Sequence, residues 1–564
     1  MGDGRGRSRL RDAAGAFTSN ALNPNLRRAQ LSFLGAWTAE WAFTVALGIV
    51  AYRDGGAVAV GLVGLLRMVP SAICAPLLSP IADRGRRERV LVLVSTVRGL
   101  ATAAAAVVAA IAGPAAIVYA LAIVSTIAAT LFRPAHSALL PSLCRTGYEL
   151  ASANMVRGLL DSAATLVGPL LAAILLQFTD VSVVFAVAAA ASLWAAALLA
   201  RVRYDAPPRP AAQRRDLLRE AAEGVKAVAR NRDLAIIIGL AGAQAFTRGA
   251  LTVFSVVVAI ELLGTGEPGA GALMTAVGVG AVVASLVASL LVGTKRLGAW
   301  FAVGVALWGL PLALVGVFPQ QAAALVFLSF IGVGNALIDL AGFTLLGRLA
   351  PDEVLARVFG VLESFVAVFI GIGAVATSGL IAWIGLQPAL IAVGLVCPVL
   401  AVVAWRRLHG LDRAVGALDA GVSLLQRVPM LAPLPLPSIE QLARGLEPAE
   451  VPAGATVFSQ GDVGDRYYVI ESGEADVVGG GRVVATLGPG EGFGEIALLR
   501  RTPRTATVVA SSPLELRMLR SDQFLPVVLG YTPSAREAEL AVDAELERYS
   551  PEPDEASGDP SPPA

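Results

Sequence analysis

The sequence predicts a polytopic α-helical membrane protein of twelve transmembrane helices in two six-helix halves, followed by a cytosolic β-roll with flanking helices. Of its 564 residues, 56% are hydrophobic and only 15% are charged, against about 25% charged in a typical soluble protein. The apolar residues are gathered in long runs between positions 29 and 405. Short alternating segments punctuated by Gly and Asp follow after position 437, as expected for strands of a small β domain.

These shifts in composition divide the chain into seven expected segments. The net charge of +1 does not suggest a nucleic-acid partner, and the three Cys residues show neither CxxC spacing nor a disulfide framework. The segments are a basic cytoplasmic N-terminus (1–28), an N-terminal six-helix half (29–200), a cytoplasmic central loop (201–233), a C-terminal six-helix half (234–405), a linker (406–436), the β-roll domain (437–549) and a disordered tail (550–564).

Twelve segments are long and apolar enough to cross a bilayer, which takes ~20 residues in a helix. Lys and Arg concentrate in alternate connections, with nine of them in the central loop Arg201–Arg232, and such residues mark the cytoplasmic side. We therefore expect a multi-pass protein of the cytoplasmic membrane with both termini in the cytoplasm. The expected spans are 30–52, 57–80, 89–112, 114–140, 153–178, 181–200, 234–262, 268–292, 298–318, 321–347, 356–385 and 387–405.

A charged motif, SPIADRGRRERV (79–90), stands between the second and third expected spans. It resembles the loop motif of the major facilitator superfamily, G-x-L-A-D-R-x-G-R-R, although Ser79 replaces the first Gly and one spacer residue is missing. The resemblance implies a latch between helix ends on the cytoplasmic side, whereas the alternative is an ordinary basic loop. The residues of this expected cytoplasmic gate are Asp83, Arg84, Arg86 and Arg87.

The fifth expected span adds to this resemblance with GLLDSAATLVGPLLAA (158–173). Its Gly168 and Pro169 match the Gly-Pro motif of superfamily exporters, in which small residues allow close helix approach and Pro bends the helix. The stretches FRPAHSALLP and ASANMVRG resemble the drug- and siderophore-efflux branch, which includes macrolide-type and enterobactin-type exporters. The resemblance covers about residues 30–405 and implies secondary active export of a small molecule.

Ionisable side chains inside the expected spans are costly in a bilayer, so each is a candidate for function. Glu40 is the best candidate for proton coupling, with Arg67 or Arg248 as its partner, because a carboxylate near mid-membrane can exchange protons. The alternative is a static buried ion pair that fixes helix packing. No GxxxxGK[ST] loop is present, so we expect an ion gradient to drive transport. The other candidates for the transport site are Arg133, Asp339 and Glu363.

The stretch FGEIALLRRTPRTATVVA (493–510) has a different chemistry. FGEIAL predicts a turn and a short helix, whose first backbone N–H groups can point at an anion. Glu495 supplies a carboxylate suited to a ribose hydroxyl, and Arg504 supplies a guanidinium suited to a phosphate. This combination suits a cyclic nucleotide. The expected site consists of Gly494, Glu495, Ile496, Ala497, Arg504, Thr505 and Ala506.

This stretch closely resembles the phosphate-binding cassette of the cyclic-nucleotide-binding domains of protein kinases A and G, gated channels and bacterial catabolite activators. The family pattern F-G-E-[LI]-A-L, followed by P-R-x-A-[TS]-V, matches residues 493–498 and 503–508, and the resemblance extends over about 437–535. It implies that Glu495 binds the ribose 2′-hydroxyl and Arg504 the cyclic phosphate. The family often has Thr at position 505 for cGMP and Ala for cAMP, but Thr also occurs in domains that bind both. The regulatory ligand is therefore cAMP or cGMP, with Tyr531 or a residue of the last helix expected over the base.

Together these observations predict a secondary active transporter, expected to be a proton-coupled exporter or antiporter of a small amphipathic molecule, regulated by a cyclic nucleotide. Two alternatives remain: a cyclic-nucleotide receptor whose membrane part senses or anchors, and a transporter of lipid or lysolipid. We do not expect an enzyme or a metal protein, because the soluble part carries no nucleophile–base pair and no metal-ligand cluster.

Overall fold

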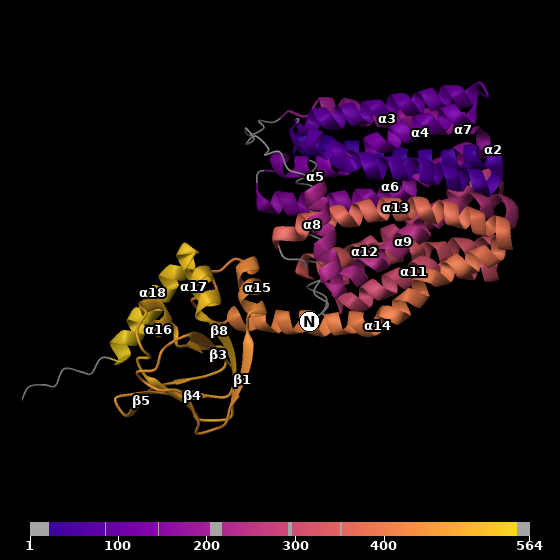
Figure 1. The fold of residues 1–564 in the computed structure, drawn as a ribbon. Helices are drawn as coiled ribbons and strands as arrows, with labels where there is room; N and C mark the ends of the chain where they lie inside the picture. The colour runs from indigo at the N-terminus through magenta and orange to yellow at the C-terminus, as the bar shows by residue number, and fades with distance from the viewer. Residues whose placement is uncertain are drawn as a thin grey trace, which may run out of the picture. The chain divides into compact units, whose positions relative to one another are not determined.

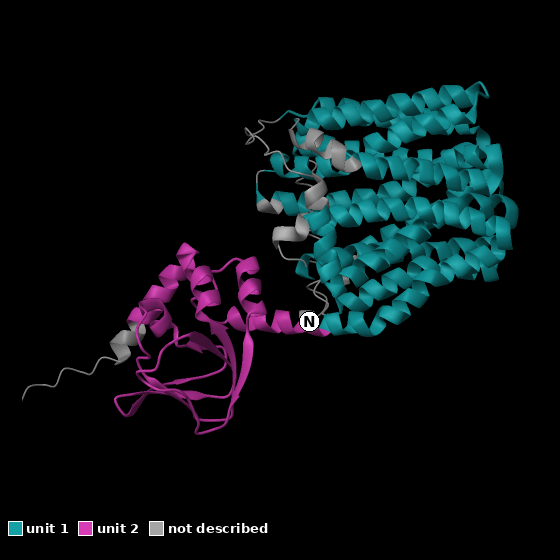
Figure 2. Cartoon of the chain, viewed as in Figure 1, with its two compact units in different colours: residues 1–412 teal, residues 413–564 magenta. Residues whose placement is uncertain are grey.

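The structure is a computed structural model that describes residues 22–84, 86–144, 146–203, 217–291, 296–349 and 352–549. The chain divides into two compact units, residues 1–412 and 413–564, shown in teal and magenta in Figure 2. The boundary falls within the segment 406–436 that we expected to be a linker. The structure continues the last apolar helix through part of this segment, because α14 runs from Leu386 to Leu425.

Long helices make up the first unit (Figure 1). Helix α2 of the first half packs against α13 of the second, and α6 packs against α10. The helices are α2 (Pro24–Arg84), α3 (Arg87–Ala110), α4 (Ala115–Ala129), α5 (Phe132–Leu143), α6 (Gly147–Phe178), α7 (Val181–Ala200), α8 (Leu217–Arg230), α9 (Arg232–Val257), η1 (Val258–Leu262), α10 (Gly266–Leu291), α11 (Leu297–Val317), α12 (Gln321–Leu349), α13 (Asp352–Ile384) and α14 (Leu386–Leu425).

By length and composition, eleven helices in the described part of the chain can cross a membrane. The first of them, α2, contains two of the twelve expected spans, and its helical geometry is interrupted at Gly55 and Gly56 between them. Gly56 has φ +61°, a left-handed conformation that residues with a Cβ rarely adopt. Within the expected span 114–140, α4 ends at Ala129 and α5 begins at Phe132, but Thr130 and Leu131 keep right-handed helical dihedrals, so Ala115–Leu143 counts as one span.

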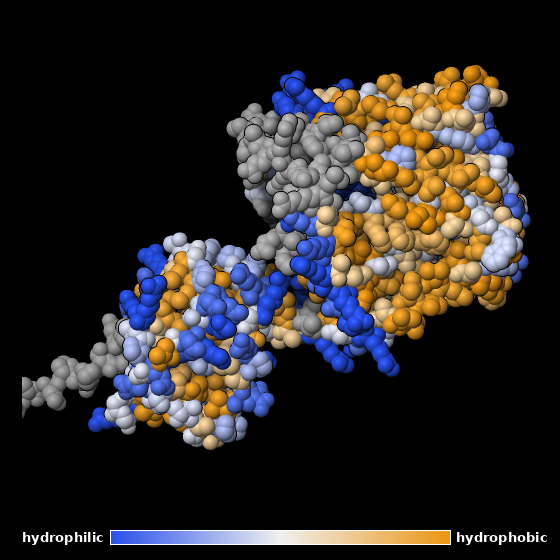
Figure 3. Space-filling model, in the orientation of Figure 1, coloured by the Kyte–Doolittle hydropathy of each residue, from blue (hydrophilic) through white to orange (hydrophobic). Residues whose placement is uncertain are grey.

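The face of the first unit seen in Figure 3 is strongly apolar, as its orange side chains show. Many large apolar side chains are exposed here although a water-soluble protein would bury them, and contiguous apolar surface of this kind marks a membrane contact. The first unit is therefore a multi-pass membrane domain. Examples are Leu93, Val107, Ile174, Phe178, Trp383, Val402 and Val403.

The second unit is a β-roll flanked by helices. Strands β1, β8, β3 and β6 form one antiparallel sheet in that order, and β2, β7, β4 and β5 form the other. The elements are α15 (Leu436–Arg444), β1 (Glu447–Val451), β2 (Thr456–Phe458), β3 (Arg466–Ser472), β4 (Ala475–Gly479), β5 (Arg482–Leu487), β6 (Gly492–Phe493), α16 (Glu495–Arg500), β7 (Thr507–Ala510), β8 (Leu514–Arg520), α17 (Ser521–Leu529) and α18 (Thr532–Tyr549).

Two hydrophobic clusters hold this unit together. One fills the space between the sheets and includes Ile470, Val508 and Leu516. The other lies among the helices and joins Leu425 at the end of α14 to Leu498 of α16 and Phe524 of α17. The helix that carries the expected nucleotide residues therefore shares one apolar core with the end of α14.

Candidate functional site

Arg504 is the centre of the pocket in the second unit. Its side chain is 3% exposed, and it donates hydrogen bonds to the carbonyl oxygens of Gly494 and Arg466, each at 2.8 Å. The guanidinium carbon lies 4.2 Å from the centroid of the Phe458 ring. Burial lowers the pKa of Arg504, and nearby acidic groups oppose that shift. Arg504 is therefore a buried cation held in place by its hydrogen bonds, unlike an arginine on the protein surface.

Backbone groups and two glycines position Arg504 in the pocket. The backbone N–H of Arg504 donates to the Asp462 carbonyl at 2.8 Å, and its carbonyl accepts from the Gly461 N–H at 2.9 Å. A Cβ at Gly464 would stand 3.3 Å from the guanidinium carbon, and one at Gly494 would stand 2.5 Å from a guanidinium nitrogen. Gly494 also has φ +91°, so glycine serves both the turn and the close approach.

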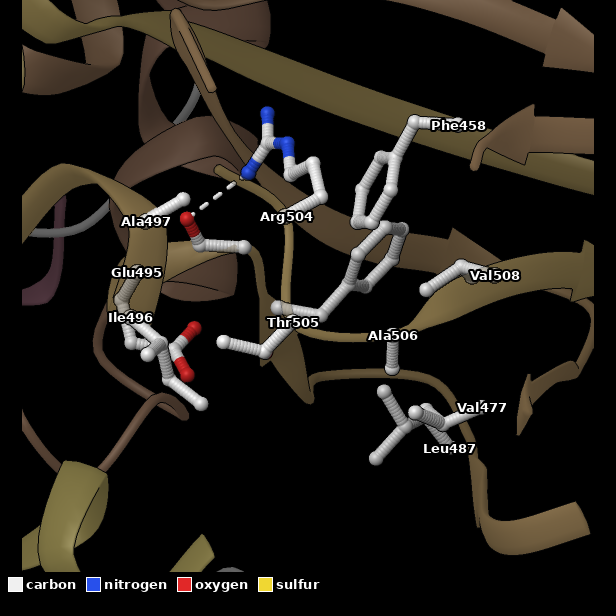
Figure 4. Close-up of a pocket in the computed structure, with 12 residues that line it drawn as sticks. Phe458, Val477, Leu487, Glu495, Ile496, Ala497, Arg504, Thr505, Ala506 and Val508 are labelled. Carbon is white, nitrogen blue, oxygen red and sulfur yellow. Dashed lines mark hydrogen bonds between the residues drawn. The ribbon is translucent and has the colours of Figure 1, made fainter. Parts of the chain in front are cut away.

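Glu495 opens the short helix α16 and is 2% exposed. It lies in the same pocket as Arg504, Thr505 and Ala506 (Figure 4), with Ile496 and Ala497 beside it. A carboxylate and a guanidinium thus face one small cavity from two different segments of the chain. Their charges suit a ligand that carries both hydroxyl donors and an anionic group.

All seven nucleotide-site residues expected from the sequence line this pocket. Sequence analysis missed its apolar wall, formed by Phe458, Val477, Leu487 and Val508 on the strands opposite α16. Side chains along a strand point alternately to its two faces, so only the pairing of β4 with β5 and β7 shows which of these side chains line the pocket. Tyr531, expected over the base, does not line the pocket and instead packs against the helical cluster.

In the membrane unit, Glu40 holds two arginines together. Its carboxylate accepts from Arg67 at 3.0 Å and from Arg98 at 2.5 Å. Both arginines are almost completely buried, at 5% and 2% exposure. Of the two partners considered, Arg67 or Arg248, the structure pairs Glu40 with Arg67, and Arg98 of α3 is an additional partner that was not expected.

The other expected transport residues lie among the helices of both halves. Arg133 on α5 forms an ion pair with Asp161 at 2.6 Å. Asp339 on α12 accepts from Asn335 at 3.0 Å and is exposed. Arg248 on α9 interacts electrostatically with Asp339 and with Glu363 of α13, although neither carboxylate is within 4.0 Å of it in the described part of the chain. The four expected residues, Arg133, Arg248, Asp339 and Glu363, thus come from four different helices.

The expected cytoplasmic gate is described only in part. The side chains of Asp83 and Arg84 lie outside the described residues, although both positions belong to α2. Arg86 forms an ion pair with Glu88 at 2.5 Å. Arg87 donates to the Ala138 carbonyl and, at 3.0 Å, to the Ser142 hydroxyl, which ties the start of α3 to α5.

A polar network that the sequence did not predict joins the two halves at the helix ends near Asp180. Arg53 of α2 makes two hydrogen bonds to Glu267 of α10, at 2.6 and 2.7 Å, and one to Asp180 at 3.2 Å. Tyr52 donates to Glu261 at 2.7 Å. Because these contacts connect α2 with η1 and α10, they hold this end of the bundle together across the halves.

Comparison with protein families finds a partial match in each unit. Residues 31–259 match the Major Facilitator Superfamily, and residues 448–531 match the cyclic nucleotide-binding domain. Each match covers less than half of the chain, the first lying within the membrane unit and the second within the β-roll unit. No group of three or more His, Cys, Asp or Glu side chains that could hold a metal ion occurs among the described residues.

Several known proteins resemble the second unit. It is 45% identical over 95 residues to a cAMP-dependent protein kinase regulatory subunit of Schizosaccharomyces pombe, which covers 17% of this chain and 23% of that protein. The corresponding subunit of Yarrowia lipolytica is 43% identical over 102 residues, covering 18% and 27%. The chain thus spans about a quarter of these relatives. The regulatory domain of Toxoplasma gondii protein kinase A, solved with cAMP, is 27% identical, with a TM-score of 0.21 and coverage of 23% and 51%.

Proposed function

We propose that this protein is a secondary active exporter of a small amphipathic molecule, in the cytoplasmic membrane, whose activity is set by cAMP bound to its second unit. The superfamily domain supports transport, and the nucleotide-binding domain supports regulation. The single observation that carries the regulatory part is the environment of Arg504. This buried cation forms no ion pair among the described residues, and its Nε has no hydrogen-bond acceptor there.

A buried charge without an ion pair is costly even when it is hydrogen-bonded, and a ligand phosphate would remove much of that cost. A phosphate can accept from the Arg504 guanidinium while ribose hydroxyls donate to Glu495, which faces the same cavity. The carboxylate would repel the phosphate if the two came together, so the site fixes the direction of the nucleotide. The apolar wall of Phe458, Val477 and Leu487 provides a surface for the remainder of the ligand.

cAMP is the proposed nucleotide because the curated relatives are named as cAMP-dependent. Thr505 adds a hydroxyl to the pocket, so we propose that cGMP binds there as well, more weakly than cAMP. The side chain of Thr505 is half-buried and its hydroxyl can donate to an acceptor on a purine base.

A route for regulation leads from the pocket to the last apolar helix. α16 carries Glu495 on the pocket side and Leu498 in the helical cluster. Leu424 and Leu425, at the end of α14, lie in that same cluster. Arg500 of α16 also forms an ion pair with Asp543 of α18 at 2.6 Å. A shift of α16 on binding would therefore repack the end of a helix that begins at Leu386 in the membrane unit.

Proton coupling is part of the proposal, and two kinds of carboxylate are available for it. Glu40 is held by ion pairs with two buried arginines, which tie α2 to α3. Asp339 and Glu363 are exposed and form no ion pair within the described ranges. We therefore propose that Asp339 or Glu363 exchanges protons while Glu40 fixes the helices.

The test uses the full chain in lipid nanodiscs, titrated calorimetrically with cAMP and cGMP. We expect saturable binding of cAMP and weaker binding of cGMP. The same preparation, reconstituted in proteoliposomes, should show dye transport that changes with cAMP. Absence of cAMP binding would refute the regulatory proposal. Binding without any transported dye would instead favour a receptor whose membrane part does not transport.

A further inference from the structure

Each of three aromatic rings on α2 lies under the guanidinium group of an arginine from a different helix. Phe33, Trp37 and Trp41 are four residues apart, so they lie on one face of the helix. The guanidinium carbons of Arg157, Arg133 and Arg248 lie 6.0, 4.6 and 5.9 Å from the respective ring centroids. We call these six residues the arginine–aromatic ladder.

The ladder crosses from one half of the membrane unit to the other. Arg133 and Arg157 come from α5 and α6, in the same half as α2, whereas Arg248 belongs to α9 in the second half. The Trp41–Arg248 contact is therefore an inter-half contact. A ligand held there touches both halves, as a transported substrate must when their relative positions change.

Several hydrogen-bond donors of the ladder have no acceptor. Trp41 Nε1 and Arg157 Nε are buried without a partner in the described part of the chain. The Arg248 side chain makes no hydrogen bond or ion pair with any described residue, whereas Arg133 is paired with Asp161. Indole and guanidinium groups are donors only. The missing partner at this position is therefore an acceptor, and a negatively charged one satisfies Arg248 best.

The nearby carboxylates do not fill this role. Asp339 and Glu363 interact electrostatically with Arg248 at longer range but form no ion pair with it. Asp339 already accepts a hydrogen bond from Asn335 at 3.0 Å. Glu40, beside Trp41 in the sequence, is occupied by Arg67 and Arg98. A cationic ligand drawn to Asp339 or Glu363 would leave the donors of the ladder unsatisfied.

We infer that the substrate is an amphipathic organic anion, whose oxyanion group is held between Arg248 and Trp41 Nε1 and whose flat apolar part lies along Trp37 and Trp41. This rests on the proposed transport function and names its substrate class. One oxyanion has enough lone pairs to accept from both donors, and the Arg248 guanidinium carbon lies only 5.9 Å from the centroid of the Trp41 ring. The aromatic rings contribute apolar area and stacking.

The test compares two probes with the same ring and opposite charge, 2-naphthoate and 2-naphthylmethylammonium. Each is titrated calorimetrically into the full chain in nanodiscs of zwitterionic lipid. We expect naphthoate to bind at least about tenfold more tightly than the ammonium probe, since a hydrogen bond to a charged group contributes about 1.5–3 kcal/mol. Tighter or equal binding of the ammonium probe, or no binding of naphthoate, would overturn the inference.

Variants locate the anion on the ladder. Arg248→Gln should weaken naphthoate binding by about tenfold or more. Trp41→Phe, which keeps an aromatic ring but removes the N–H donor, should weaken it by roughly threefold to tenfold. The control is Arg407→Gln, because Arg407 lies on α14 in a loose ion pair with Asp233 at 3.8 Å, outside the ladder. Unchanged naphthoate affinity in both ladder variants would contradict the inference.

Cyclic-nucleotide binding by each variant provides the check on folding and separates the two proposals. If Arg248→Gln and Trp41→Phe retain wild-type cAMP affinity, lost naphthoate binding is local to the ladder. Naphthoate binding through Arg248 without any effect of cAMP on transport would uphold the substrate class and reject regulation. Preference for the ammonium probe, with cAMP-dependent dye transport intact, would reject the substrate class alone.

Discussion

The nucleotide pocket and the Glu40 network of the membrane unit differ in how far apart in the sequence their residues lie. The pocket takes its two charged groups, Glu495 and Arg504, from positions nine residues apart. The network around Glu40 instead joins α2 to itself and to α3, with partners 27 and 58 residues away. A short contiguous motif fixes its own local geometry, whereas the membrane network depends on how whole helices are rotated and packed.

The largest predicted effect concerns the Glu40 network. Glu40→Gln leaves the buried guanidinium groups of Arg67 and Arg98 without their shared counter-charge. We expect a loss of about 3–5 kcal/mol in the free energy of unfolding, the usual cost of breaking a buried ion pair. Thermal or denaturant unfolding of the protein in detergent measures it.

Glu363→Gln is the matched control, since Glu363 is exposed and forms no ion pair among the described residues. Its stability should stay within about 0.5 kcal/mol of the wild type. If both variants were equally stable, the Glu40 pairs would not support the fold. Glu40 would then return as the better candidate for proton exchange.

The second prediction concerns Arg504. Arg504→Gln removes the buried cation and should weaken cAMP binding by about 100-fold or more, because two charge-assisted bonds to a phosphate contribute about 1.5–3 kcal/mol each. Calorimetric titration of the full chain measures this change. Arg501→Gln, an exposed arginine of the same segment, should bind cAMP within about twofold of wild type. Similar losses in both variants would mean that general charge, not the pocket, attracts the nucleotide.

The smallest predicted effect concerns Thr505. Thr505→Ala removes one hydroxyl from the pocket. We expect cGMP affinity to fall by roughly twofold to tenfold, the value of one neutral hydrogen bond of about 0.5–1.5 kcal/mol, with a smaller change for cAMP. Parallel titrations with both nucleotides measure the ratio. An equal loss for the two would show that Thr505 contacts a part of the ligand that they share.

The same contrast explains what could be predicted from the sequence. Short alternating apolar segments predicted strands of a β-roll, but β1 and β6 have no such pattern. β1 reads Glu-Pro-Ala-Glu-Val, with two acids and a proline, and β6 has only two residues, so neither carries an alternating pattern. Both are strands because β8 and β3 offer them hydrogen-bonding edges, which is a tertiary property.

For the sites, the sequence showed which residues are candidates but not which of them contact one another. The charged positions within the spans were evident because charges are rare there. Sequence could not show that Arg98 is an additional partner of Glu40, or that Arg248 lies over Trp41. It also missed the bond between Arg53 and Glu267, because residues 214 positions apart leave no local pattern.

The most direct test of the central claim is transport by proteoliposomes with and without saturating cAMP on the side of the nucleotide domain, for wild type and Arg504→Gln. Release of anionic, cationic and neutral fluorescent amphipathic dyes is followed in parallel. The account predicts that cAMP changes the rate for at least one dye in the wild type and leaves it unchanged in Arg504→Gln, whose rate without cAMP equals that of the wild type. Equal responses of both proteins, or no response in either, would contradict nucleotide control of transport.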